Sequence, residues 1–182
     1  MQFKSILFAG FFGALLACIG ATTSPSNLEE RNLLGEVIDA LNVGLVTSIS
    51  VFITLESLTD NLVSINFNTQ NILPFELTID SITSTAGINN TVFASFDHSF
   101  GLHPVVVPPL GKQNSGNITN VLLTQGATAS LAIIPLGILD LINTNVNVRA
   151  GTILGIGGVP LAITGLHQAS VPTTCVTDPL SG

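Results

Sequence analysis

The sequence predicts a mainly β fold, an antiparallel β-sandwich of seven to eight strands with one N-terminal helix. From residue 44 onward, apolar and polar residues alternate with the period of two that is typical of half-buried strands. Gly, Pro, Asn and Asp interrupt this alternation roughly every 8–12 residues, as turns between short strands do. Neither an internal repeat nor a second domain boundary is visible, so a single core is expected.

The N-terminal segment has the order of a secretory signal peptide. Lys4 precedes an apolar run, Ile6–Ala21, after which the chain turns polar. A retained signal anchor fits less well, because the run is shorter than the about 20 residues that span a bilayer. A lipoprotein processed at Cys18 also fits less well, because Leu16 is unusual in that pattern. We therefore expect a secreted protein, located in the extracellular space, the cell wall or the vacuolar lumen.

A short helix is expected after the signal peptide. Asn27 can cap it, Glu30 completes a capping box, and Gly44 is a plausible stop. Apolar residues recur between them at helical spacing. The expected segments are a signal peptide (residues 1–21), a linker with the helix (22–43), the β-sandwich domain (44–170) and a loose C-terminal tail (171–182).

The alternation places the strands. Pro residues exclude 103–111 from the centre of a sheet, so this segment is expected to cross between strands. A helical turn is expected at 135–141 and a glycine-rich break at 155–160. Strands are expected at 45–55, 63–68, 75–80, 92–97, 116–124, 127–134, 145–150 and 161–164.

The stretch from Phe75 to Phe100 is expected to form a hairpin. A two-residue turn at Asn89–Asn90 sets a register that places most apolar residues on one face, with Phe96 opposite Thr83. Ile82 is the exception, and a bulge near Asp80–Ser81 would return it to the apolar face.

Composition excludes several classes of function. Without the signal peptide the only cations are Arg31, Lys112 and Arg149, against eleven acidic residues, so nucleic acid and anionic membranes are not expected partners. Trp and Tyr are absent, which argues against ligand stacking on aromatic rings. Cys18 leaves with the signal peptide, so Cys175 has no partner within the chain and is expected to be inert.

The residues that could support catalysis are few. Asp97 and His98, with His103 nearby, form the densest cluster, but Asp97 and His98 are adjacent on a strand, so their side chains point to opposite faces and cannot both line one site without a bulge. His167 lies far away in the sequence, and Glu76 and Asp80 are expected on an open outer face without a cleft. The run GTILGIGG lacks the Lys-Ser/Thr of a phosphate loop. We therefore expect no enzyme, no cofactor and no metal.

Two sequons, at Asn89 and Asn117, lie beside turn-rich sequence. In a eukaryotic secretory pathway each is a candidate site for an N-linked glycan.

The segment INFNTQNILPFELTIDSI, residues 65–82, resembles the water-stress/hypersensitive-response domain of the group 2 late-embryogenesis-abundant proteins. In that family a strand runs into an Asn-Pro pair and a short alternating strand follows. Here Asn71 and Pro74 occupy this place, separated by two residues. Together with the signal peptide and the sequons, the chain is similar to small secreted fungal proteins of this type. The resemblance implies a fibronectin- or immunoglobulin-like sandwich without catalysis, associated with stress protection or with binding at membranes or cell walls.

Three functional hypotheses remain. The first is a secreted, non-enzymatic protein that acts through its surface, with a component of the cell wall or of a membrane surface as partner. The second is a carrier of an apolar ligand or lipid between the sheets, suggested by the high aliphatic content. The third is a hydrolase that uses Asp97, His98 or His103.

Overall fold

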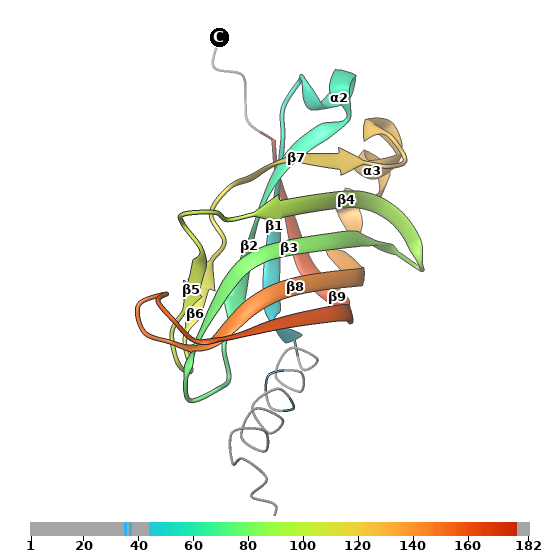
Figure 1. Cartoon of the computed structure of the whole chain (residues 1–182). Helices are drawn as coiled ribbons and strands as arrows, with labels where there is room; N and C mark the ends of the chain where they lie inside the picture. The colour runs from blue at the N-terminus through green and yellow to red at the C-terminus, as the bar shows by residue number, and fades with distance from the viewer. Residues whose placement is uncertain (1–34, 36, 38–43, 178–182) are drawn as a thin grey trace, which may run out of the picture.

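The computed structural model describes residues 35, 37 and 44–177 of the chain, and its strands form a closed barrel (Figure 1). The mainly β prediction is confirmed, but the prediction of an antiparallel sandwich is wrong, because seven strands close into a mixed barrel. The elements are β1 Val46–Ile53, α2 Ser57–Asp60, β2 Leu62–Gln70, β3 Glu76–Ile88, β4 Thr91–Ser99, β5 Val105–Val107, β6 Lys112–Asn114, β7 Ile118–Leu123, α3 Ala127–Ile133, the 3-10 helix η1 Ile134–Leu136, β8 Ile138–Thr152 and β9 Val159–Thr177.

The barrel closes through β1. The strand order is β1-β9-β8-β3-β4-β7-β2, and β2 pairs again with β1. Ile49 of β1 lies opposite Phe67 of the antiparallel strand β2 and opposite Thr173 of the parallel strand β9. The short strands β5 and β6 pair with β3 and β2 outside this ring. Because β1 is paired on both sides, the ring has no open edge between its first and last strands.

The end of the chain explains why the sandwich prediction failed. Residues 171–177, expected to be a loose tail, belong to β9 and pair with β1, so that expectation was wrong. Alternating inward residues look the same in a sandwich and in a barrel, since both bury one face of each strand. The two folds differ here in the partner of the last strand, and the weakly apolar sequence VPTTCVT gives little indication of it.

The β3–β4 hairpin confirms the predicted turn. Asn89 and Asn90 both have positive φ, 50° and 62°, and they connect paired Ile88 and Thr91. A Cβ at Gly87 would lie 1.8 Å from the carbonyl oxygen of Thr91, so only glycine fits there.

The predicted pairing further along this hairpin was wrong by one residue. The register of β3 with β4 shifts between Ala86 and Gly87, so Phe96 lies opposite Ser84 instead of Thr83. The predicted bulge near Asp80–Ser81 is confirmed in the pairing of β3 with β8, which shifts between Ile79 and Ser81. This bulge places Ile82 in the core, where it is 2% exposed.

The segment 127–134, expected to be a strand, is the helix α3 with the start of η1, and that expectation was wrong. Gly126 has φ of 81°, which turns the chain out of β7, and the Ala-rich sequence ATASLAI suits a helix. The expected helical turn at 135–141 is limited to η1, since β8 begins at Ile138.

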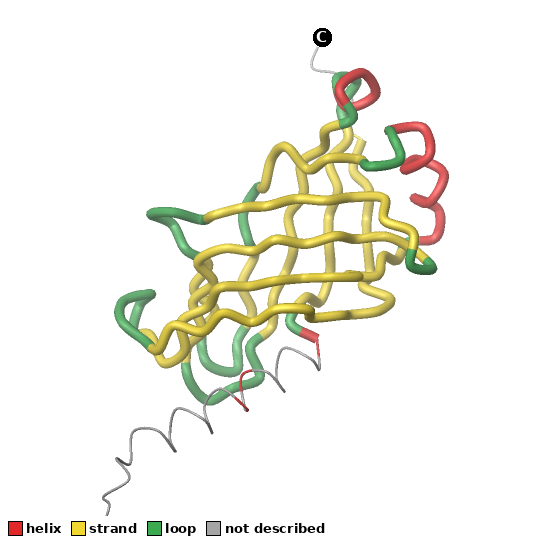
Figure 2. Tube along the Cα trace, turned by 45° about the vertical axis from the view of Figure 1, so that its right-hand side comes forward, coloured by secondary structure: helices red, strands yellow, loops and turns green. Residues whose placement is uncertain are grey.

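The core fills the barrel with buried aliphatic side chains from every strand of the ring except β4, whose Ala94 and Phe96 are half-buried and pack against it. Leu77, Ile79, Val146 and Val148 from the long strands β3 and β8 are at most 1% exposed. In Figure 2 the strands wrap around this interior, and helical segments gather beside one end of it. For about eight strands a barrel interior is just wide enough to be filled by side chains or to hold one small ligand.

The predicted signal peptide and most of the predicted N-terminal helix lie outside the described residues. Gly35 and Val37 are described; both are helical, and Val37 is fully buried in the core. Within residues 44–177 and these two positions, no helix is long and apolar enough to cross a membrane.

Candidate functional site

The interior of the barrel contains an apolar cavity of about 80 Å³ near the β8 end that begins at Ile138. Its lining comes from all seven strands of the ring and from the segment 127–138. The strand residues that line it are Val46, Ile49, Val51, Ile53, Val63, Ile65, Phe67, Ile82, Ser84, Ala86, Phe93, Ala94, Phe96, Val121, Leu123, Ile138, Leu139, Leu141, Thr173 and Cys175. No charged side chain belongs to this lining.

The helices α3 and η1 form a cover over the cavity. Ala127, Leu131 and Ile134 contribute side chains to the lining. The cover is thin, because Leu131 and Ile134 are only half-buried and Leu136 is 56% exposed. Asn61 at the end of α2 fixes the start of the cover, since its Oδ1 accepts a hydrogen bond from the backbone N–H of Ala127 at 2.8 Å.

Most polar groups at the cavity are already paired. The hydroxyl groups of Ser84 and Thr144 lie 2.6 Å apart and are hydrogen-bonded to each other. Thr173 donates its hydroxyl to the carbonyl oxygen of Val171. Burial raises the pKa of the Cys175 thiol, which favours the neutral, unreactive form. The arrangement therefore suits the retention of an apolar molecule and offers no acid, base or cation at the cavity wall.

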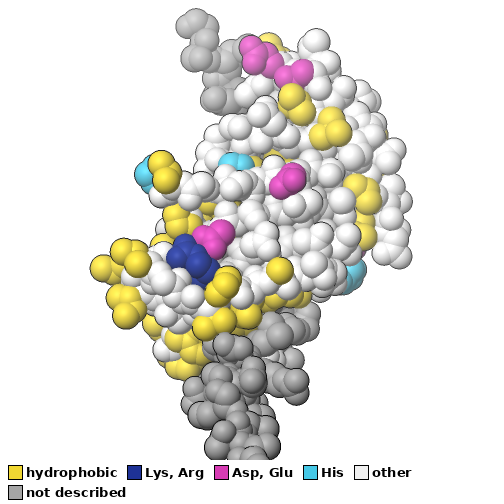
Figure 3. Space-filling view, in the orientation of Figure 1, with side chains coloured by type: hydrophobic (Ala, Val, Ile, Leu, Met, Phe, Trp, Pro, Cys, Tyr) yellow, Lys and Arg dark blue, Asp and Glu magenta, His cyan; other side chains and the backbone are white. Residues whose placement is uncertain are grey.

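A second feature lies at the other end of β8, at the turn to β9. Ile153, Leu154 and Ile156 are 77%, 84% and 77% exposed, and we call these three residues the aliphatic tip. Ile153 and Ile156 exchange two backbone hydrogen bonds of 3.1 Å, which gives the turn a fixed shape. Figure 3 shows hydrophobic side chains gathered over this projecting hairpin, next to a cluster of charged groups.

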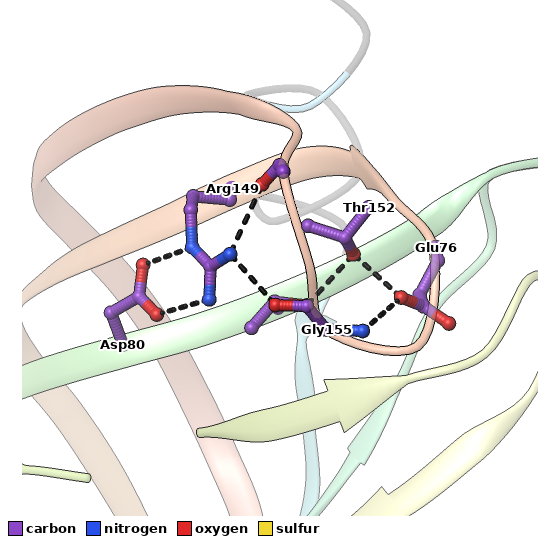
Figure 4. Close-up of polar contacts among 7 residues, drawn as sticks. Glu76, Asp80, Arg149, Thr152 and Gly155 are labelled. Carbon is purple, nitrogen blue, oxygen red and sulfur yellow. Dashed lines mark hydrogen bonds and ion pairs between the residues drawn. The ribbon is translucent and has the colours of Figure 1, made fainter. Parts of the chain in front are cut away.

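Arg149 makes four hydrogen bonds, two to the carboxylate of Asp80 and two to the turn (Figure 4). Its Nε and Nη2 donate to the two carboxylate oxygens of Asp80, each at 2.8 Å. Its Nη1 donates to the carbonyl oxygens of Gly155 and Gly157 at 2.7 and 3.0 Å. The hydrogen bonds to Asp80 raise the pKa of Arg149. A single guanidinium thus joins the bulge of β3 to the glycine-rich turn.

Glu76 fixes the other side of the turn. Its Oε1 accepts hydrogen bonds from the backbone N–H of Gly155 at 2.9 Å and from the hydroxyl of Thr152 at 2.7 Å (Figure 4). These hydrogen bonds, that from Gly155 above all, lower the pKa of Glu76 below its ordinary value. The carboxylates nearest to the turn are therefore engaged within the protein.

The residues considered for catalysis are not brought together as one site. Asp97 is exposed and accepts a hydrogen bond from Thr83 at 3.1 Å, whereas His98 is half-buried and packs edge-on against Phe100, with ring centroids 4.8 Å apart. His103 is exposed on the loop before β5. Among the residues that the structure describes, no group of three or more His, Cys, Asp and Glu could hold a metal ion. The expectation that the chain is not an enzyme stays a prediction.

Both sequon asparagines are exposed, Asn89 at the β3–β4 turn and Asn117 between β6 and β7. Attachment of glycans to them stays a prediction.

Sequence reasoning missed Arg149 and Ser130 as functional candidates. Arg149 is named in the sequence analysis only as one of three cations, although its rarity as a cation was a usable signal. Ser130 was assigned to a strand that does not exist, and no pattern in the sequence places its side chain at a cavity.

Comparisons with known proteins add little. No family model matches the chain, and no curated protein matches it. One solved structure, described as a crystal structure of a protein from Archaeoglobus fulgidus, is similar over 60% of this chain and 84% of that chain, with 10% sequence identity and a TM-score of 0.27. At that TM-score the likeness supports no conclusion about fold or function. The resemblance to the late-embryogenesis-abundant domain likewise stays a prediction.

Proposed function

We propose that the protein binds a small apolar molecule inside its barrel and acts as a carrier for it. The observation behind this proposal is the apolar cavity under the α3–η1 cover. An apolar pocket with few polar groups is the usual form of a small-molecule site. The thin cover supplies a route of entry that leaves the closed ring of strands intact.

The size of the cavity limits the ligand. Its about 80 Å³ is roughly half of the ~150 Å³ cavity that takes up benzene in another protein. The barrel therefore accepts a molecule of a few carbon atoms without rearrangement. A longer chain, or a molecule as large as a fluorescent probe, requires outward movement of the cover, which is offset by about 0.8 kcal/mol for each methylene group that leaves water.

Binding of a fluorescent apolar probe to two matched variants tests this proposal. Ala86 lines the cavity and is 6% exposed, so Ala86→Leu fills the space that the probe would occupy. Ala132 is exposed on α3 and does not line the cavity, so Ala132→Leu adds the same side chain without filling it. We expect saturable, stoichiometric binding by the wild type and Ala132→Leu, and at least tenfold weaker binding by Ala86→Leu. Equal binding by both variants, with the fold of each verified by circular dichroism, would contradict an interior site.

A second candidate function is attachment to a surface through the aliphatic tip. Three aliphatic side chains project together, while Asp80, Arg149 and Glu76 beside them are hydrogen-bonded within the protein. An apolar projection without free charge can enter the interface of a neutral membrane without desolvating an unpaired ion. We propose a membrane surface of zwitterionic lipid as the partner.

Sedimentation with phosphatidylcholine vesicles tests the second candidate. The variant Leu154→Asp places a charge at the most exposed position of the tip and should abolish co-sedimentation, whereas Leu102→Asp, at an exposed loop position of 94%, should not. Absence of wild-type co-sedimentation, or equal effects of both variants, would refute attachment through the tip. A wild-type dimer in solution that Leu154→Asp dissociates would assign the tip to self-association instead.

We propose that either function is exercised outside the cell. The signal-like N-terminus and the exposed sequons at Asn89 and Asn117 support this proposal. The intact mass of protein collected from culture medium, before and after deglycosylation, is the direct test. Protein retained in cells with residues 1–21 still attached would contradict it.

A further inference from the structure

Ser130 has a buried hydroxyl group without a partner. Ser130 is one of the residues that line the cavity, and it is 8% exposed. Its backbone N–H donates to the carbonyl oxygen of Gly126 at 3.1 Å, but its Oγ makes no hydrogen bond. In the described part of the chain, it is the one buried side-chain oxygen or nitrogen left in this condition.

Other buried hydroxyl groups show how this protein normally treats such atoms. Thr78 and Thr152 are hydrogen-bonded to each other at 2.8 Å, and Ser84 and Thr144 at 2.6 Å. Thr69 donates to the carbonyl oxygen of Gln113 at 2.9 Å. The absence of a partner therefore distinguishes Ser130 from the other buried hydroxyl groups, including that of Ser84 in the same cavity wall.

The unpaired hydroxyl is unfavourable in the empty protein. Burying such a group without a hydrogen bond costs about 1–3 kcal/mol. Alanine at this position would avoid the cost and has the higher helix propensity. Alanine already occupies positions 127, 129 and 132 of the same helix. A serine that opposes stability at a cavity wall is explained by a partner that arrives with the ligand.

The rest of the wall limits the chemistry of that partner. The lining has no charged side chain that could compensate an ion, and desolvating an unpaired carboxylate or ammonium is strongly unfavourable. The hydroxyl of serine both donates and accepts hydrogen bonds, so it can pair with an alcohol or a carbonyl group.

We propose that the ligand is an uncharged, short aliphatic molecule with a single hydroxyl or carbonyl group, and that this group hydrogen-bonds to Ser130 Oγ after a rotation of the serine side chain turns the hydroxyl toward the cavity. The inference rests on the proposed carrier function and specifies its ligand class. Ser130 supplies the polar contact from the cover, and the strands supply the apolar wall. Binding would thus also hold the cover in its closed position.

Competition for the barrel by three small molecules tests this inference. The compounds pentane, 1-pentanol and pentanoate share a chain length and differ in the polar group. Each compound competes with a fluorescent apolar probe for the full-length wild type, for Ser130→Ala and for Ser130→Thr, and the displacement of the probe is measured. We expect pentanol to bind the wild type at least tenfold more tightly than pentanoate at pH 7. Ser130→Ala should lower the affinity for pentanol by about tenfold and leave the affinity for pentane unchanged. Ser130→Thr should retain most of the affinity for pentanol.

Two other outcomes would refute either the hydrogen bond to Ser130 or the carrier function. If Ser130→Ala changes the affinities for pentane and pentanol by the same factor, or changes neither affinity, the hydrogen bond to Ser130 is refuted while the carrier function survives. If none of the three compounds displaces the probe, and the probe itself does not bind saturably, the carrier function fails with it.

Thermal unfolding of the ligand-free proteins supplies an independent readout. Removal of an unpaired hydroxyl should raise the melting temperature of Ser130→Ala. A lower melting temperature would mean that the hydroxyl has a partner in the empty protein, and would overturn the inference.

Discussion

The backbone N–H of Ala127 donates a hydrogen bond of 2.8 Å to Oδ1 of Asn61, and this contact joins the cover of the barrel to its wall. Asn61 ends α2 in the left-handed conformation, with φ of 60°, and its own carbonyl oxygen accepts the N–H of Leu123 in β7. One residue therefore fixes both the last residue of β7 and the first residue of α3. At its other end the cover leads into β8 through Gly137, which also has positive φ.

Loss of this hydrogen bond should loosen the cover more than the barrel. Asn61→Gly keeps the left-handed backbone but removes the acceptor, so we expect the free energy of unfolding to fall by about 1 kcal/mol. Amide hydrogen exchange in residues 127–136 should accelerate, while exchange in β3 and β8 should change only by the amount that the lower global stability explains. Asn61→Ala should cost about 1 kcal/mol more, because alanine tolerates the left-handed conformation poorly. Unchanged exchange in the cover would show that Asn61 does not restrain it.

The contribution of Glu76 to stability should depend on pH. Folding lowers the pKa of this carboxyl group, so its stabilising effect is fully present above the ordinary pKa, about 4.3. The effect disappears as the pH falls through the lower pKa of the folded state. Glu76→Gln should therefore be less stable than the wild type at neutral pH, and the difference should shrink as the pH is lowered from about 6 toward 3. Chemical denaturation at several pH values measures this, with Glu56→Gln as the matched control. A difference that is constant with pH would contradict the assigned role of Glu76.

The geometry of the Arg149 guanidinium, which makes several hydrogen bonds at once, should contribute more to stability than its charge. Arg149→Lys keeps a cation near Asp80 but cannot make two parallel hydrogen bonds to the carboxylate and two more to the turn. We expect a loss of about 0.5–1.5 kcal/mol in the free energy of unfolding, after allowance for partial exposure of the pair. The NMR signals of residues 153–158 should broaden, and Lys112→Gln should leave them unchanged. Sharp, unshifted signals in Arg149→Lys would show that the turn keeps its shape without the guanidinium.

Cys175 should report occupancy of the cavity. Burial raises the pKa of its thiol, so alkylation by iodoacetamide at pH 8 should be several-fold slower than that of an exposed cysteine. Saturation with an apolar ligand should slow it further, because the side chain belongs to the cavity lining. Peptide mapping by mass spectrometry follows Cys175 separately from Cys18. Alkylation at the same rate with and without ligand would argue against occupancy of this part of the barrel.

Local patterns in the sequence predicted local structure well. The turn at Asn89–Asn90 and the bulge that buries Ile82 both follow from alternation and turn chemistry, which depend on neighbouring residues only. The helix at 127–133 was mistaken for a strand because a run of small and apolar residues has no decisive period over so short a length.

Closure of the barrel could not be read in the same way. It depends on the parallel pairing of β9 with β1, for instance Val51 with Cys175, between segments more than a hundred residues apart. The cavity depends on this closure, since its lining comes from all seven strands, whereas the aliphatic tip depends on the pairing of the two longest strands, β8 and β9. Their residues therefore became visible only in three dimensions.

Methyl-labelled protein titrated with 1-pentanol tests the central claim, binding inside the barrel, most directly. We expect saturable chemical-shift changes at the interior methyl groups of Ile82, Val121 and Leu141, which line the cavity. The methyl groups of the exposed tip, Ile153, Leu154 and Ile156, should stay unchanged in the same titration. Changes confined to the tip, or no change at the interior methyl groups at saturating pentanol, would contradict the proposed carrier function.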